Sequence, residues 1–92
     1  MILIRVFHTY ATIMEKLPDY LKDNLRRDVS RVLVGKFDDA FDSYWRIKEI
    51  LFDEYKQGNI SRKQYKLAMR RLRDIFVKRF GILPSRVLIG GD

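Results

Sequence analysis

Cysteine is absent from the 92-residue sequence, and histidine occurs only once, as His8. The lack of cysteine excludes disulfides, thiolate nucleophiles and zinc fingers or ribbons, so packing and charge must supply the stability of the fold. A single imidazole also cannot provide a Ser/His/Asp triad or a pair of histidine ligands. We therefore predict that the protein is not an enzyme, and we interpret His8 as a structural residue.

The sequence contains no clear pattern for a metal site or for a phosphate-binding loop. Asp38, Asp39 and Asp42 could be imagined as ligands of Mg²⁺, but acidic residues in a first helical turn are usual partners of the helix dipole. Gly90 and Gly91 lack both the spacing and the following helix of a phosphate-binding loop. We predict no metal site and no cofactor.

Long apolar runs are missing as well. No stretch approaches the roughly 18 to 20 apolar residues that span a bilayer. The opening sequence MILIRVF has Arg5 within its apolar part and no cleavage site of small residues, unlike a secretion signal. We expect a soluble protein of the cytoplasm.

The residues that are present suffice for one folded domain. Hydrophobic residues make up 47% and aromatic residues 13% of the chain, which is too much for a disordered basic tail. A chain of this length has room for a single core, so we predict one domain over residues 1–92.

Basic residues are concentrated in the C-terminal part of the chain. Residues 1–54 carry nine basic and ten acidic side chains, whereas residues 55–92 carry ten basic and two acidic ones. Nearly all of the formal net charge of +7 therefore lies in the second segment. Such asymmetry is typical of a surface that meets a polyanion, most often nucleic acid. The alternative is a solvated face whose charge has no partner and only favours solubility.

Apolar residues recur at helical spacing through most of the chain. Residues 2–17 stay open between helix and strand, because the first of them alternate as in a strand while a longer set recurs every three or four residues. After Pro18 the pattern predicts a helix that ends at Gly35. A wide apolar stripe from Phe37 to Tyr55 predicts the next helix.

The best-defined helix start lies at Ser61. Ser61 is placed to cap a helix, and Gln64 three residues later completes the pattern of a capping box. This helix should end at Gly81. Because residues 58–61 alone join it to the preceding helix, the two helices should be antiparallel neighbours. We predict an all-α fold, a small bundle of three or four helices built on this long antiparallel hairpin.

The last predicted helix separates its charged residues from its apolar ones. Cations on one side of a helix can contact successive phosphates, which gives affinity with little sequence information. A helix-turn-helix fits poorly, because the helix before the turn is too long. We interpret the aromatic residues, Trp45 included, as core. The candidate nucleic-acid-binding residues are Arg62, Lys63, Lys66, Arg70, Arg71, Arg73 and Lys78.

The tail, residues 82–92, carries a short apolar run between Pro84 and Gly90. It could cover the core, add a strand to another protein or dock on a partner. Our candidate partner-binding residues are Val87, Leu88 and Ile89.

The profile of the whole chain resembles a known family. The shared features are the length, the absence of cysteine, the few amide side chains and a basic helix with the segments Arg62-Lys63-Gln64-Tyr65-Lys66 and Arg70-Arg71-Leu72-Arg73. In these respects the chain is similar to the small, basic, helical accessory subunit of the crenarchaeal family-B DNA polymerase holoenzyme, a protein of heat-adapted archaea. The resemblance implies a non-catalytic subunit that binds a DNA polymerase and helps it hold primer-template DNA. It does not extend to sliding-clamp binding, because Arg70 and Arg71 stand where the clamp-binding pattern has two aromatic residues.

Two functions of different classes remain open at this stage. In the first, the protein is a basic accessory factor in DNA transactions that contacts phosphates through the cationic helix and a protein partner, such as a DNA polymerase, through another surface. In the second, it is a structural module whose helical hairpin pairs with a second copy and whose charge is solvated. The resemblance favours DNA as the polyanion, whereas the residues themselves do not distinguish DNA from RNA.

Overall fold

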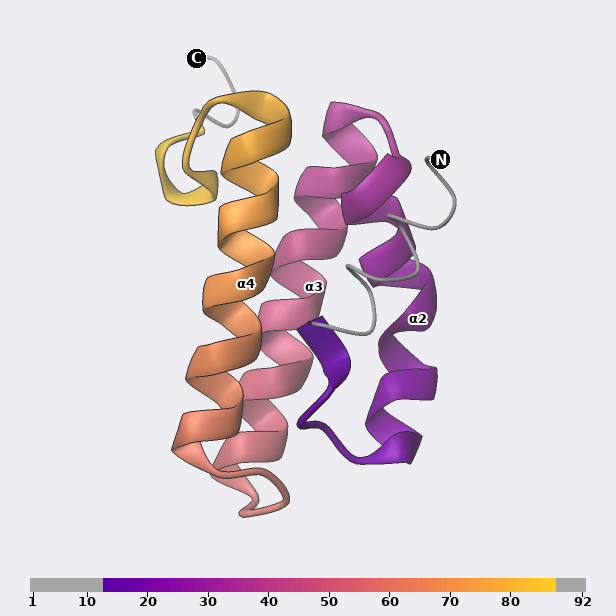
Figure 1. The fold of residues 1–92 in the computed structure, drawn as a ribbon, viewed down its shortest axis with the longest axis vertical. Helices are drawn as coiled ribbons and strands as arrows, with labels where there is room; N and C mark the ends of the chain where they lie inside the picture. The colour runs from indigo at the N-terminus through magenta and orange to yellow at the C-terminus, as the bar shows by residue number, and fades with distance from the viewer. Residues whose placement is uncertain (1–12, 88–92) are drawn as a thin grey trace.

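The computed structural model describes residues 13–87, and these residues form a helical bundle. Three long helices, α2 (Asp19–Val34), α3 (Phe37–Lys56) and α4 (Arg62–Phe80), are followed by the short 3₁₀ helix η1 (Pro84–Arg86). No strand occurs within residues 13–87. Figure 1 shows α3 between α2 and α4, so the predicted all-α bundle built on an antiparallel hairpin is confirmed.

The segment left open between helix and strand is described only in part. Ile13 and Met14 are helical, and the chain then turns into Pro18, which precedes the first turn of α2. Positions 2–12 of that segment lie outside the described residues.

The boundary between α2 and α3 requires glycine at position 35. The Gly35 N–H donates to the carbonyl of Arg31 at 2.7 Å. A Cβ atom added at Gly35 would lie only 2.5 Å from that same carbonyl oxygen, which belongs to the backbone and cannot move aside. Gly35 therefore lets the chain leave α2 tightly and begin α3 two residues later.

The capping box predicted for α4 is present. The Gln64 N–H donates to Ser61 Oγ at 3.0 Å, and the Ser61 N–H donates to Gln64 Oε1 at 2.6 Å. These two bonds satisfy backbone donors that the first turn of a helix otherwise leaves unpaired. At the other end, Gly81 has a φ of 72°, in the left-handed region that favours glycine, and ends α4 as predicted.

The core fills the space between the three helices and the segment 13–17. An aromatic group lies at one end of it, where the Phe37 ring stands 5.2 Å from Phe80 and 5.9 Å from Phe76 between ring centroids. The buried hydrophobic side chains are Ile13, Met14, Leu17, Leu21, Leu25, Val29, Val32, Ala40, Tyr44, Ile47, Leu51, Ile60, Ala68, Leu72 and Phe76.

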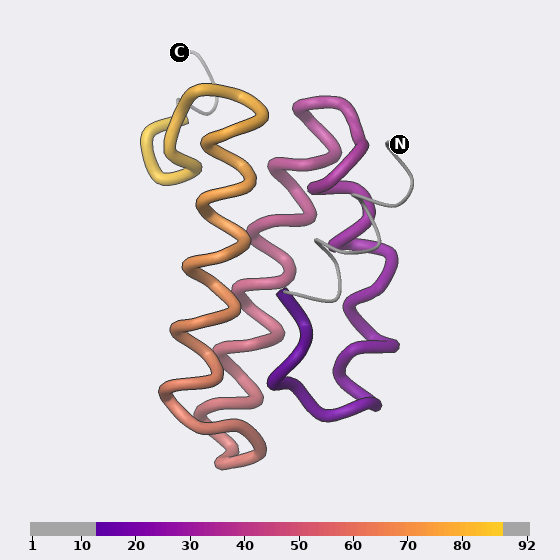
Figure 2. Tube along the Cα trace, viewed as in Figure 1, coloured from indigo at the N-terminus to yellow at the C-terminus, as the bar shows by residue number. Residues whose placement is uncertain are grey.

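Residues 13–17 join the bundle through polar contacts to α4. In Figure 2 this segment leads into the turn that precedes α2. Gln64 Nε2 donates to the carbonyl of Lys16 at 2.5 Å, and Arg71 Nη1 donates to Glu15 Oε1 at 2.7 Å. The segment is thereby attached to α4, the helix in which the net positive charge of the chain is concentrated.

Polar side chains also fix α2 against its neighbours. The buried carboxylate of Asp28 accepts hydrogen bonds from Ser43 Oγ at 3.0 Å and from Arg46 Nη1 at 3.2 Å, both on α3. Arg79, near the end of α4, donates to the carbonyl of Val32 at 2.8 Å. Because that carbonyl belongs to the last turn of α2, Arg79 satisfies an acceptor that the helix leaves unpaired. None of the helices within residues 13–87 is long and apolar enough to cross a membrane.

Candidate nucleic-acid interface

Six of the seven predicted cations are exposed on α4. The seventh, Arg71, is half-buried, with 28% of its side chain exposed, and forms the ion pair with Glu15. That ion pair also holds the pKa of the Glu15 carboxyl below its usual value, first through the hydrogen bond from Arg71 and then through its charge. Arg71 is thus used within the fold. The exposed members are Arg62, Lys63, Lys66, Arg70, Arg73 and Lys78.

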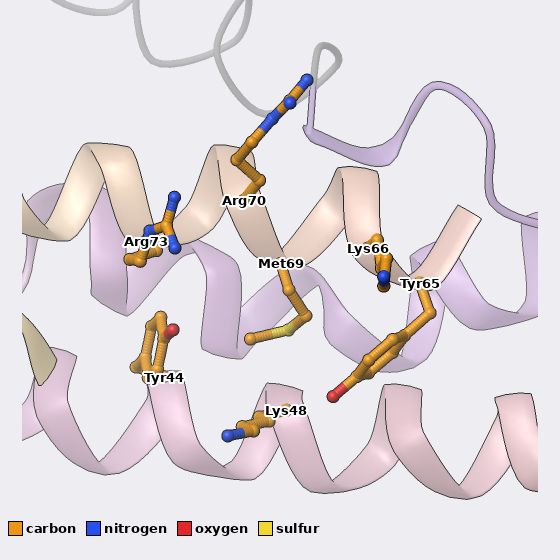
Figure 3. A pocket seen from close by; sticks show the side chains of 7 residues that line it. All are labelled: Tyr44, Lys48, Tyr65, Lys66, Met69, Arg70 and Arg73. Carbon is orange, nitrogen blue, oxygen red and sulfur yellow. The ribbon is translucent and has the colours of Figure 1, made fainter. Parts of the chain in front are cut away.

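Three of these cations border a cleft between α3 and α4, which we call the inter-helix cleft (Figure 3). Its volume is about 340 Å³. Tyr44 and Lys48 project into it from α3, while Tyr65 and Met69 project from α4. Arg70 stands at the rim and points away from α3. The full lining is Tyr44, Lys48, Tyr65, Lys66, Met69, Arg70 and Arg73.

Positive charge and burial both act on the tyrosine hydroxyls of this cleft. Burial raises the pKa of Tyr44, and the nearby Arg73 guanidinium partly opposes that rise. Burial also raises the pKa of Tyr65. Both phenols are therefore neutral at physiological pH and can donate a hydrogen bond. The cleft offers donors and cations, which are the groups that bind phosphate oxygens.

A second cleft of about 570 Å³ adjoins the first, because Lys48 and Tyr65 line both. We call it the aromatic cleft, and its lining is Trp45, Lys48, Glu49, Phe52 and Tyr65. Phe52 is 44% exposed although it belongs to the predicted apolar stripe of this helix. Trp45, expected in the core, is half-buried at the edge of the same cleft.

Two lysines stand over the rings of the aromatic cleft. The ammonium of Lys48 lies 4.9 Å from the centroid of the Trp45 ring, and that of Lys56 lies 5.5 Å from the centroid of the Phe52 ring. Both are cation–π contacts at surface positions, which contribute little stability. The indole N–H of Trp45 is buried and has no hydrogen-bond acceptor among the described residues.

The cationic surface continues around α4, away from α3. Lys66 and Arg70 also line a hollow of about 260 Å³ with Lys63 and Leu67. Lys66 and Arg70 therefore lie between the inter-helix cleft and this second hollow and line both of them. Arg62 and Lys78 are exposed on the same helix but line none of these three clefts.

Sequence reasoning missed Lys48, because it lies on α3 among residues that were interpreted as an apolar stripe. The sequence places Lys48 three residues after Trp45, but it does not show which helix Lys48 faces. The packing of α4 against α3 brings Lys48 to the same cleft as Lys66 and Arg73. The tail is described only in part. Val87 is half-buried after η1, whereas Leu88 and Ile89 lie outside the described residues.

Acidic groups are sparse at these clefts. Glu49 is the acidic residue of the aromatic cleft, and Asp74 lies 3.6 Å from Arg73 in an exposed ion pair. Within residues 13–87, no group of three or more His, Cys, Asp or Glu side chains is placed to hold a metal ion.

Comparison of the chain with protein-family models, with curated proteins and with solved structures finds no match.

Proposed function

We propose that this chain is a non-catalytic accessory protein in DNA transactions that binds the phosphates of nucleic acid through α4 and Lys48. The observation that carries the proposal is the inter-helix cleft, where four cations from two helices border one hollow lined by neutral phenols. A cationic face that served only solubility would need neither this convergence nor the hydrogen-bond donors.

The spacing of the cations supports contact with an extended anion. Lys66 and Arg70 are four residues apart on α4, which is about 6 Å along the helix axis, and Arg73 follows on the next turn. Each can meet a different phosphate oxygen. Arginine does so with paired donors and lysine as a point charge.

Binding of this kind depends little on base sequence. The amide of Gln64, which could contact a base edge, is already used by Ser61 and Lys16. The remaining polar groups on this surface are cations and phenols, which suit phosphate contacts. Affinity should therefore come mainly from the release of counterions and should fall with salt.

The test is fluorescence anisotropy with labelled single-stranded, duplex and primer-template DNA between about 50 and 200 mM salt. We expect the logarithm of the association constant to fall linearly with the logarithm of salt concentration. In the variant Lys66→Gln with Arg70→Gln, binding to every DNA should weaken, and the slope should lose about two phosphate contacts. Glutamine keeps the helix propensity of the residues that it replaces.

A charge-matched control removes two cations from another part of the surface. Arg27 on α2 and Lys36 at the start of α3 are exposed and line none of these three clefts. Changing both to Gln lowers the net charge equally and should leave the slope closer to that of the native protein. Equal loss in the two double variants would mean that overall charge, and not the α4 surface, attracts DNA.

The proposal includes a protein partner, and a DNA polymerase is the first to test. Apolar side chains support such a contact at the far end of α4, where Ile82 and Leu83 are 37% and 36% exposed beside η1. Co-sedimentation with a family-B polymerase, with and without primer-template DNA, should show a complex. A second copy of this chain is the alternative partner, and sedimentation of the protein alone distinguishes the two.

A further inference from the structure

Resting on the proposed function, we propose that the aromatic cleft holds unpaired bases, so that the preferred ligand is a single strand. The inference concerns Trp45 and Phe52, which the phosphate contacts alone do not require, together with Tyr65, which lines both clefts. It names a ligand class, single-stranded nucleic acid, and the surface that distinguishes it from a duplex.

The first argument is the continuity of the two clefts. Tyr65 and Lys48 line both, so a strand with phosphates at Lys66 and Arg73 has its bases next to the aromatic cleft. The phosphates and the bases of a single strand can then be held at once. In a duplex the bases are stacked and paired, and their faces are not available to a protein ring.

The second argument is the exposure and environment of the rings. Phe52 is 44% exposed, although an aromatic ring on a helix beside a core is normally packed away from water. The Phe52 and Tyr65 rings pack against each other, with centroids 5.9 Å apart at an angle of 55°, and both line the aromatic cleft. A base laid on the outer surface of these rings covers apolar area that is otherwise in water.

The third argument is that a lysine stands over each of two rings in the protein without a ligand. Lys48 and Lys56 occupy the positions above Trp45 and Phe52 where a base would stack. A base that displaces them leaves two flexible ammonium groups beside its own phosphates. The exchange replaces two weak cation–π contacts by stacking and by ion pairs with the strand.

The experiment uses Trp45, the only tryptophan of the chain, as its own reporter. The protein is titrated with oligo-dT of about 12 nucleotides, with a DNA duplex of the same length and with heparin, a polyanion without bases. We expect oligo-dT to quench and shift the tryptophan emission. Duplex and heparin should bind, as measured by anisotropy or competition, without that change.

The variant Phe52→Leu tests the stacking surface while keeping an apolar side chain at the position. We expect it to weaken oligo-dT binding roughly tenfold, with duplex and heparin binding and the salt slope unchanged. The matched control is Tyr20→Leu, which removes a ring that is 48% exposed on α2, together with its hydrogen bond to Glu54 on α3, and should leave oligo-dT binding as it is. Circular dichroism and thermal melting establish that each variant is folded.

The outcomes separate this inference from the proposed function. Binding of all three polyanions with the same effect on Trp45 emission, or with no effect of Phe52→Leu, overturns the single-strand inference and leaves the phosphate surface standing. No binding of any polyanion at low salt overturns the proposed function, and this inference with it. A shift of Trp45 emission with protein concentration alone would show that a second copy fills the cleft and would also overturn the inference.

Discussion

Ser43 illustrates how one small polar residue connects two helices. Its hydroxyl is fully buried on α3 and donates to the buried carboxylate of Asp28 on α2. A further hydrogen bond to Asp28 comes from Arg46, whose side chain is 56% exposed. Ser43 therefore supplies the buried part of the partnership that makes a carboxylate tolerable in the core.

We predict that Ser43→Ala lowers the free energy of unfolding by about 1 to 3 kcal/mol, because the carboxylate of Asp28 loses a buried donor. Urea denaturation followed by circular dichroism measures this loss. Ser30→Ala is the control, since Ser30 is exposed on α2 and the same change in helix propensity applies there. A loss no larger than that of the control would mean that the Ser43 bond does not stabilise the fold.

At the same scale, the sequence predicts some residues and not others. Ser61, Gln64, Gly35 and Gly81 were predicted because their roles depend on neighbours in the chain. Asp28 was not, because its partners are 15 and 18 residues away and nothing in α2 alone distinguishes it from an exposed acid. Residues whose function needs a second helix escape single-sequence reasoning.

At the scale of the element, α4 concentrates like charges that repel one another. Lys66 has Arg62 and Arg70 four residues to either side, and Lys63 precedes Arg70 by two turns. Like charges four residues apart destabilise a helix by about 0.2 to 0.5 kcal/mol per pair at low salt. The charge that suits a phosphate-binding surface thus opposes the stability of its own helix.

We therefore expect the Lys66→Gln, Arg70→Gln variant to melt at a higher temperature than the native protein at low salt. The difference should shrink as salt screens the repulsion. Thermal melts by circular dichroism at low and high salt measure it, with the Arg27→Gln, Lys36→Gln variant as the charge-matched control. An equal rise in both would assign the effect to net charge and not to crowding on α4.

Of the two clefts, the sequence predicted the cations of one but not the exposed rings of the other. The predicted basic face of α4 lies at the surface, with Arg71 diverted to Glu15. The aromatic cleft was not predicted, because a stripe that holds Trp45 and Phe52 on α3 is indistinguishable in sequence from a fully buried one. Phe76 and Phe80 of α4 pack on Phe37, whereas Phe52 contacts Tyr65 of the same helix and still stays exposed.

At the scale of the whole molecule, the ion pair between Glu15 and Arg71 joins positions 56 residues apart. Arg71 lowers the pKa of Glu15 below its ordinary value, so the folded protein binds the proton less readily than the unfolded chain does. A lowered pKa contributes stability above the unfolded value, and this contribution is lost as pH falls through the folded value.

We predict that Glu15→Gln is less stable than the native protein at neutral pH and that the two converge as pH falls below the ordinary pKa of a glutamate carboxyl, about 4.3. Thermal melts across this range measure the convergence. Glu49→Gln is the control, because it removes an exposed carboxylate that forms no ion pair with any residue from 13 to 87. A constant difference between Glu15→Gln and the native protein at all pH values would contradict a role for the Glu15 charge.

The amide of Gln64 has a consequence for how the molecule folds. Its oxygen accepts from Ser61 within the start of α4, and its NH₂ donates to Lys16 from a segment nearly fifty residues earlier. Glutamate could make the first bond but lacks the donor for the second, so glutamine alone serves both. The local signal that starts a helix and the distant contact that closes the bundle share one side chain. Folding of the hairpin and docking of residues 13–17 are therefore coupled, which favours a single cooperative transition.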